Sequence, residues 1–355
     1  MPEIAIMTDS NCGIMPSEQE KYGIHVLPMP IIIDGKTYFE GVDISTEEFY
    51  KKQISGSVIT TSQPSPGDVT SMWDDLLKEY DEIVFIPMSS GLSNTCQTAL
   101  LLADDEAYRG KVFVVNNHRI SVTQALSVLD AKVLSEEGRT AAEILDILEK
   151  EAMDATIYIA VDTLEYLKKG GRITAAAAAI GTVLKLKPVL TIQGDKLDSY
   201  AKARGMKSAF RVMLDALKTD IASRFSHLEE QGHLKLGIAN TMMEPEKLEQ
   251  FKNELQKAFP NLELVYFPLT MSIGTHVGPG GLGIGAVPSL LSISAIIIGV
   301  VVIRVVIRVS IGAVIVRTVS ITAAGAASAA ITRIPRRCGG NRRLRRGCHS
   351  GLRRP

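Results

Sequence analysis

The 355-residue sequence predicts an α/β fold: an N-terminal α/β domain around a parallel sheet, and a second α/β domain around a largely antiparallel sheet. In the first part of the chain, short apolar strands alternate with helical segments, which is typical of a parallel sheet covered on both faces. From about residue 153 the pattern changes, and two neighbouring strands meet at Gly194–Asp195, a favoured hairpin turn. We therefore expect domains at 1–152 and 153–287, followed by a tail at 288–355.

The elements of the first domain follow from apolar periodicity and helix-start signals. Ser45 with Glu48 has the pattern of a capping box, and Ser65 with Pro66 has that of a capped helix start with proline at its first position. The expected strands are 3–10, 82–87 and 111–117, together with a β-rich run at 24–34 that Pro28 and Pro30 break. The expected helices are 45–53, 69–80, a segment that ends near 104, 120–136 and 140–154.

The second domain begins with an apolar strand and a short helix that glycine closes. Its strands are expected at 155–161, at two segments within 187–203, at 233–239 and at 262–269. Its helices are expected at 163–171, 173–184, 205–225 and 245–259. The helix at 173–184 is unusually rich in alanine, which favours close helix packing over a ligand-binding wall.

The charge balance hides two unlike regions. The chain has 39 basic and 39 acidic residues, but twelve arginines and no lysine or acid fall within 288–355. The remaining body has 27 basic and 39 acidic residues, unlike the basic surface that binds nucleic acid. We interpret the tail as a non-native or disordered Arg-rich extension. A membrane anchor is the alternative, although Arg304, Arg308 and Arg317 interrupt its apolar run.

Cysteine usage and the N-terminus indicate a cytoplasmic protein. Cys12 and Cys96 are far apart and match no zinc or redox spacing, so they are interpreted as isolated thiols. The first residues lack the basic and apolar segments of a signal peptide. No metal or cofactor is expected.

Three hydroxyl-rich segments carry the strongest functional signal. They are "TDSN" (8–11), "TTSQPS" (60–65) and "SSGLSNT" (89–95), placed after strands or before helices. One such segment is explained by ordinary helix capping. Ligands of parallel α/β sheets bind outside the carboxyl ends of the strands, so three segments at one edge predict a site. Hydroxyl and N–H groups with few charges suit a carboxylate or a phosphate.

Other candidate residues have competing interpretations. The segment around Ser93 lacks the second glycine of a nucleophile elbow, which argues against a catalytic serine. A Ser-dependent hydrolase or acyltransferase is therefore kept only as the alternative function. "GPGGLG" (278–283) fits a dinucleotide fingerprint but has no strand directly before it, and we reject it. His276 is expected in an accessible glycine-rich loop, as a functional or a packed side chain. Arg172 and Arg204 are interpreted as solvated charges.

The motifs taken together resemble the DegV family of bacterial fatty-acid-binding proteins. "TDS", "TTSQPS", "SSGLSNT", "DTLEYLKKGGRI", "LKLKPVLTIQGDKL", "AKARG" and "IGTHVGPGGLG" occur in this order over residues 3–285. Each motif alone is weak, but the ordered set is specific. The family ends shortly after the "THVGPG" segment, so the tail departs from it and the non-native interpretation gains support.

The resemblance implies a lipid-binding carrier with a ligand tunnel between the two domains. Thr61 and Ser93 match the positions that bind the fatty-acid carboxylate, with Ser62 and Asn94 as neighbours. Arg204 and His276 match positions linked to hand-over of the lipid to a separate fatty-acid kinase, which forms an acyl-phosphate. By this resemblance the chain is not itself an enzyme, takes part in phospholipid metabolism and contacts membranes only transiently.

Overall fold

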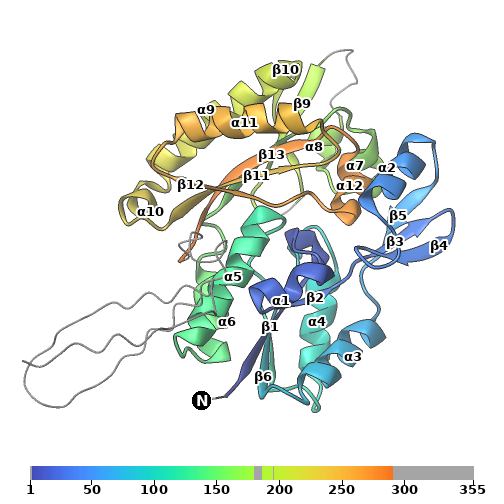
Figure 1. The fold of residues 1–355 in the computed structure, drawn as a ribbon, viewed down its shortest axis with the longest axis vertical. Helices are drawn as coiled ribbons and strands as arrows, with labels where there is room; N and C mark the ends of the chain where they lie inside the picture. Colours follow the sequence, from blue (N-terminus) through green and yellow to red (C-terminus); the bar gives the residue numbers. More distant parts are fainter. Residues whose placement is uncertain (1, 180–185, 195, 291–355) are drawn as a thin grey trace, which may run out of the picture. The chain divides into compact units, whose positions relative to one another are not determined.

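The computed structural model describes residues 2–179, 186–194 and 196–290 (Figure 1). Its first sheet has four parallel strands in the order β2-β1-β6-β7. The strands are β1 (Ile4–Asp9), β2 (His25–Leu27), β6 (Glu82–Ile86) and β7 (Val112–Val114). This sheet confirms the parallel sheet that the alternating pattern predicted.

Helices of this part of the chain pack on this sheet or, for the helix at Thr46–Ile54, on the small antiparallel sheet described below (Figure 1), and two of them begin at the serines that the sequence indicated. The Ser65 hydroxyl accepts a hydrogen bond from the Asp68 backbone N–H with Pro66 at the first helical position, and the Ser45 hydroxyl accepts one from Glu48 N–H. Trp73 and Phe85 pack edge to face in the core below. The helices are α1 (Gln19–Tyr22), α2 (Thr46–Ile54), α3 (Pro66–Leu76), α4 (Thr95–Ala103), α5 (Val122–Glu136) and α6 (Ala141–Lys150), with 3₁₀ turns at Ser10–Cys12 and Pro16–Glu18.

A three-stranded antiparallel sheet, in the order β4-β3-β5, was not predicted. It comprises β3 (Pro30–Ile33), β4 (Lys36–Phe39) and β5 (Ile59–Thr61). The β-rich run expected at 24–34 is interrupted at the expected prolines, because the chain leaves the parallel sheet after Leu27, next to Pro28, which has no N–H to donate. The hydroxyl-rich segment at 60–65 begins inside β5, so Thr61 is the last residue of a strand.

The second large sheet has six strands in the order β10-β9-β8-β13-β11-β12, and only the β11–β12 pair is parallel. The largely antiparallel sheet predicted for the second half is therefore confirmed. The strands are β8 (Thr156–Ala160), β9 (Leu186–Ile192), β10 (Asp198–Arg204), β11 (Leu234–Asn240), β12 (Glu263–Tyr266) and β13 (Leu282–Pro288). The helices are α7 (Glu165–Gly170), α8 (Ala175–Ala178), α9 (Met206–Ser223), α10 (Ser226–Glu230), α11 (Pro245–Ala258) and α12 (Met271–Val277).

The two faces of the six-stranded sheet have different neighbours. On one face α9 and α11 bury an apolar core that includes Phe210 and Phe251 (Figure 1). On the other face α5 contacts β11 and β13, while its opposite side contacts β1 and β6 of the parallel sheet. Because α5 lies between the sheets, its N-terminal turn faces the space between them.

The C-terminal strand β13 extends one residue beyond the boundary expected at 287, since Pro288 pairs with Leu234. The Asp130 carboxylate then accepts hydrogen bonds from the Ser289 hydroxyl and the Leu290 N–H. The rest of the expected tail lies outside the described residues. The boundary expected near 152 falls between α6 and β8 and stays a prediction. Across the described segments, every helix is too short or too polar to cross a bilayer.

Candidate functional site

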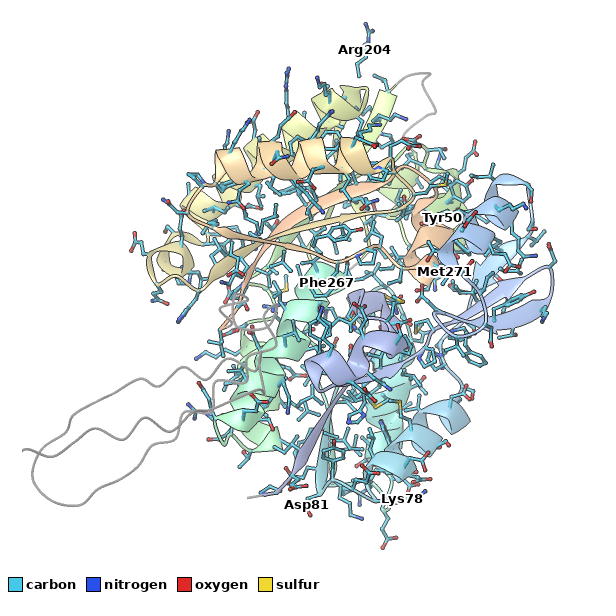
Figure 2. The ribbon with its side chains drawn as sticks, viewed as in Figure 1. Tyr50, Lys78, Asp81, Arg204, Phe267 and Met271 are labelled. Atoms are coloured by element: carbon cyan, nitrogen blue, oxygen red, sulfur yellow. The ribbon has the colours of Figure 1, made fainter. Side chains whose placement is uncertain are left out.

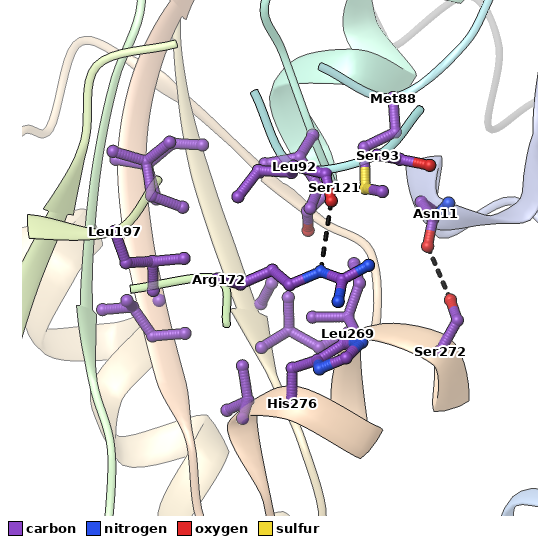
Figure 3. Close-up of a pocket in the computed structure, with 18 of the residues that line it drawn as sticks. Asn11, Met88, Leu92, Ser93, Ser121, Arg172, Leu197, Leu269, Ser272 and His276 are labelled. Atoms are coloured by element: carbon purple, nitrogen blue, oxygen red, sulfur yellow. Dashed lines mark hydrogen bonds between the residues drawn. The ribbon is translucent and has the colours of Figure 1, made fainter. Parts of the chain in front are cut away.

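A cavity opens between the parallel sheet, the six-stranded sheet and α12 (Figure 3). We define two groups among the residues that line it, a polar wall and an apolar wall. The polar wall, from the loops, β5 and α12, comprises Asn11, Thr61, Ser93, Arg172, Ser272 and His276. The apolar wall, from the six-stranded sheet, comprises Ile157, Ile159, Ile192, Gly237, Gly283 and Gly285. A molecule in this cavity therefore meets hydrogen-bonding groups on one side and hydrocarbon on the other.

His276 and Thr61 form a direct contact in the polar wall, 215 residues apart in the chain. The Thr61 Oγ1 and His276 Nε2 atoms are 2.8 Å apart. Burial, together with the nearby charge of Arg172, lowers the pKa of His276 to about 4, so the imidazole is neutral at pH 7. A Cβ at Gly170 would overlap His276 Nδ1, which explains a glycine there.

His276 does not lie in the accessible loop that the sequence predicted. It belongs to α12, a seven-residue helix, and its imidazole is largely buried. The helix is held from outside itself: the Gln53 side-chain amide donates to the Gly274 carbonyl oxygen, and the Glu40 carboxylate accepts from the Ser272 N–H. These tertiary contacts stabilise a helix in a segment whose glycine content indicated a loop.

Arg172 is the residue that sequence reasoning missed. Its guanidinium lies in the cavity between Leu197 and the Asn11–Ser272 pair (Figure 3). Nε donates to the Leu92 carbonyl oxygen at 3.3 Å and Nη1 to the Gly170 carbonyl oxygen at 2.5 Å. Burial lowers its pKa, and within the described part of the chain no carboxylate pairs with it. The interpretation as a solvated charge is therefore wrong for Arg172.

Ser93 and its neighbours lie where the chain turns from β6 into α4. The Ser93 hydroxyl is 2.8 Å from the Thr95 hydroxyl and accepts a hydrogen bond from the Thr95 N–H. Ser93 is buried and lines the cavity, and Ser62 lines it although its side chain is exposed. Asn94 is exposed at the N-cap of α4 and does not line the cavity.

Arg204 is also away from the cavity. It is the last residue of β10, its side chain is exposed, and it extends away from the molecule (Figure 2). Of the six residues proposed from sequence, the structure thus brings Thr61, Ser62, Ser93 and His276 to one cavity and leaves Asn94 and Arg204 outside it.

Two buried carboxylates support the polar wall from behind. Glu40 accepts hydrogen bonds from the Ser10 hydroxyl at 2.5 Å and the Ser272 N–H at 3.0 Å. Asp9 accepts from the Asn11 backbone and side-chain amides at 3.0 and 2.9 Å, and the Ser272 hydroxyl donates to Asn11 Oδ1 at 2.5 Å. Burial raises the pKa of both acids, that of Glu40 to about 7. The "TDSN" segment indicated Asp9 and Asn11, whereas no local pattern marks Glu40.

Ser121, at the N-cap of α5, adds a hydroxyl that the sequence did not single out. Its side chain lines the cavity, is 7% exposed and has no hydrogen-bond partner among the residues that the structure describes. Its φ of +57° lies in a region that non-glycine residues rarely adopt. Strained residues of this kind occur at ligand sites, where the surrounding fold fixes them. Throughout the segments described, no group of three His, Cys, Asp or Glu side chains is arranged to hold a metal ion.

Comparison with known proteins gives a consistent family. The family model described as "Uncharacterised protein, DegV family" matches residues 3–289. A DegV domain-containing protein of Caldanaerobacter subterraneus subsp. tengcongensis is 34% identical over 291 residues, covering 80% of this chain and 98% of the relative. Protein DegV of Bacillus subtilis is 31% identical over 284 residues, covering 79% and 98%.

Solved structures give the same result. A DegV family protein from Thermus thermophilus, described for its fatty acid binding, superposes with a TM-score of 0.72 at 31% identity, over 81% of this chain and 99% of that one. DegV of Bacillus subtilis, described as a fatty acid binding protein, gives a TM-score of 0.70 at 27% identity, over 81% and 100%.

Proposed function

Because this chain belongs to the DegV family, we propose that it binds a long-chain fatty acid in the cavity and presents the carboxylate to a separate fatty-acid kinase. The acyl chain lies along the apolar wall, and the carboxylate faces the polar wall. The fatty acids bound by the Thermus thermophilus and Bacillus subtilis proteins support this ligand class.

The observation that carries the proposal is the Arg172 guanidinium. A partly buried cation without a carboxylate partner among the described residues is unfavourable by itself, because the Leu92 and Gly170 carbonyl oxygens replace only part of the hydration that burial removes and supply no opposite charge. A ligand carboxylate supplies the missing charge and accepts charge-assisted hydrogen bonds. The free acid, rather than an ester or an alcohol, is therefore the preferred ligand.

The hydroxyls of the polar wall complete the carboxylate site. Thr61 and Ser93 donate to the carboxylate, with Ser62 at its edge. Neutral His276 holds the Thr61 side chain in place across 2.8 Å. Asn94 is exposed on the outer side of this loop, so its contribution is limited to fixing the loop that bears Ser93.

The acyl chain supplies most of the affinity. Burying about fifteen methylenes at ~0.8 kcal/mol each gives ~12 kcal/mol before the freedom lost on association is subtracted. The polar wall then needs only to keep the buried carboxylate from being left without partners. This division of roles leaves the head group available for later chemistry.

The alternative of a Ser-dependent hydrolase has little support in the geometry. The Ser93 hydroxyl contacts Thr95 rather than a histidine. His276 contacts Thr61, and an imidazole with a pKa of about 4 is a weak base at neutral pH. Neither hydroxyl has the activated base that nucleophilic catalysis requires.

In the proposed hand-over, a partner kinase phosphorylates the carboxylate to an acyl-phosphate. The extra negative charge that develops there is stabilised by nearby cations. Arg204 is exposed and available to a partner, while His276 lines the cavity and contacts Thr61 beside the carboxylate. We assign both residues to hand-over rather than to retention of the lipid.

Mass spectrometry of the purified chain tests this function. Protein from a bacterial host is measured intact under native conditions and again after organic extraction. A non-covalent fatty acid in the native spectrum, released on extraction, supports the carrier. A covalent acyl group on Ser93 supports the hydrolase instead, and the absence of any fatty acid after incubation with hexadecanoic acid contradicts the carrier.

A further inference from the structure

The apolar wall contains two rows of side-chain positions that cross three neighbouring strands. Strand register places Gly283 between Ile159 of β8 and Ala239 of β11, and Gly285 between Ile157 and Gly237. Alternate residues of a strand face opposite sides of a sheet. Leu282 and Ala286 accordingly belong to the core under α9 and α11, whereas the glycines between them face the cavity.

Two of these glycines are required by the packing of the protein itself. A Cβ on Gly285 would overlap the Thr156 carbonyl oxygen. A Cβ on Gly237 would lie 2.8 Å from Val122 Cγ1, which is closer than side-chain carbons approach. Glycine at these positions needs no ligand as an explanation.

Gly283 is different, because no contact with the described residues demands a glycine there. The nearest atoms to a Cβ at this position are 3.7 Å and 3.9 Å away, which is ordinary van der Waals contact. Its φ is not among the positive values of the chain. Glycine inside a strand costs stability, since it loses more backbone freedom and packs no side chain. A compensating reason must therefore lie in the cavity.

An independent observation indicates that this cavity is built for a ligand. The Ser121 hydroxyl lines the same cavity, is 7% exposed and has no hydrogen-bond partner in the described part of the chain. A buried hydroxyl left without a partner is unfavourable unless a ligand or water completes it.

The order of the two rows along the cavity follows from chain connectivity. Only the segment 278–281 separates α12, which bears His276, from Leu282 at the start of β13. The Gly283 row is therefore nearer to the polar wall, and the Gly285 row lies about 7 Å further along the strand. A chain held by its carboxylate passes Gly283 before it reaches Gly285.

We propose that Gly283 determines the length of acyl chain that this cavity accepts: the chain passes over Gly283, and a side chain there narrows the passage and weakens the binding of chains that extend to the Gly285 row, more so the larger the side chain. The inference rests on the proposed binding of fatty acids. It adds a specificity-determining position on the apolar wall, where no hydrogen-bonding group could have indicated one.

The test compares Gly283→Ala and Gly283→Val with Gly67→Ala in the full chain after lipid removal. Gly67 is an exposed helical glycine whose Cβ would also meet only ordinary contact, 3.7 Å from Ser65 Oγ, and it does not line the cavity. Calorimetry measures the affinities for hexadecanoic and octanoic acid, and thermal unfolding checks the fold of each variant.

We expect Gly283→Val to lower the affinity for hexadecanoic acid by about tenfold or more, which corresponds to expelling roughly two methylenes from the cavity. The affinity of Gly283→Val for octanoic acid should change by less than about threefold. Gly283→Ala should lower the affinity for hexadecanoic acid by a smaller factor, and Gly67→Ala should leave both affinities unchanged. Unchanged affinity for hexadecanoic acid, equal losses for both acids, or an unfolded Gly283→Ala protein would each overturn the inference. If the unmodified chain binds neither acid, the proposed function fails with it.

Discussion

The two walls of the cavity differ in how they are built. Every named group of the polar wall is held by other residues: Glu40 and Asp9 fix Ser272 and Asn11, and His276 fixes Thr61. The apolar wall has no such network, and its shape comes from strand register and from missing side chains at Gly237, Gly283 and Gly285. Orientation of the ligand is thus separated from the main source of its affinity, so each wall can be changed without the other.

The largest effect should come from removing the support behind the polar wall. Glu40→Ala leaves the buried Ser272 N–H and Ser10 hydroxyl without their acceptor. Lost buried partners of this kind cost about 2–4 kcal/mol in the free energy of unfolding. Chemical denaturation measures the change, with Glu254→Ala on the exposed face of α11 as the control. A loss similar to that of the control would show that the network does not hold this wall.

A somewhat smaller effect should appear in the pH dependence of stability. Burial raises the pKa of Glu40 to about 7, so the folded protein keeps a proton that the unfolded chain releases near its ordinary value of 4.5. This contribution is complete below about pH 4.5 and is lost as the pH rises through about 7. Glu40→Gln does not titrate and should therefore gain about 2 kcal/mol relative to the unmodified chain between pH 5 and pH 8.

Denaturation of both proteins at the two pH values provides the measurement. The other buried acids, Asp9 and Asp130, are present in both proteins and largely cancel in the difference. A constant difference between pH 5 and pH 8 would mean that Glu40 does not change its protonation in this range.

Smaller still are the effects of single hydroxyls on binding. Thr61→Val or Ser93→Ala should lower the affinity for hexadecanoic acid by about tenfold, because each substitution removes one hydrogen bond to the charged carboxylate. The free energy of unfolding should fall by only about 1–2 kcal/mol, because Thr61 loses its contact with His276, Ser93 loses its contacts with Thr95, and neither substitution removes much apolar area. Thr60→Val, at the exposed neighbouring position of β5, is the matched control. Affinities equal to that of the control in both variants would remove these residues from the carboxylate site.

The smallest effect on binding should come from Arg204, which lies outside the cavity. Arg204→Ala should retain bound fatty acid within about twofold while lowering acyl-phosphate formation in an assay reconstituted with a fatty-acid kinase. Lys207→Ala, an exposed position of α9, controls for the loss of a surface charge. A normal rate of acyl-phosphate formation with Arg204→Ala would exclude a role in hand-over.

Local signals were sufficient for much of the fold. The Ser65–Pro66 helix start and the hairpin at Gly194 were predicted because a few neighbouring residues determine them. By contrast, β13 was missed because Gly283 and Gly285 lower its strand propensity, although pairing with β8 and β11 fixes it. The helix α12 was missed because contacts from Gln53 and Glu40 stabilise it.

Prediction of the site from the sequence has the same limit, because local signals do not reveal tertiary contacts. Thr61 and Ser93 stand in hydroxyl-rich segments that are visible in the sequence, and the fold brings both to the cavity. Arg172 follows the glycine pair that ends the short, lysine-containing helix α7, which is a typical setting for a solvated charge. Only tertiary structure places its guanidinium beside Leu92, away from any carboxylate in the part of the chain that is described.

The most direct test of the two-wall account compares hexadecanoic acid with hexadecan-1-ol, which has the same chain and no charge. Calorimetry would measure both ligands with the unmodified chain and with Arg172→Met, which keeps an unbranched side chain but removes the cation. The account predicts that the unmodified chain binds the acid at least about tenfold more tightly than the alcohol. Arg172→Met should lose most of this preference while its affinity for the alcohol stays the same. Equal binding of acid and alcohol by the unmodified chain, or a full preference for the acid in Arg172→Met, would contradict the account.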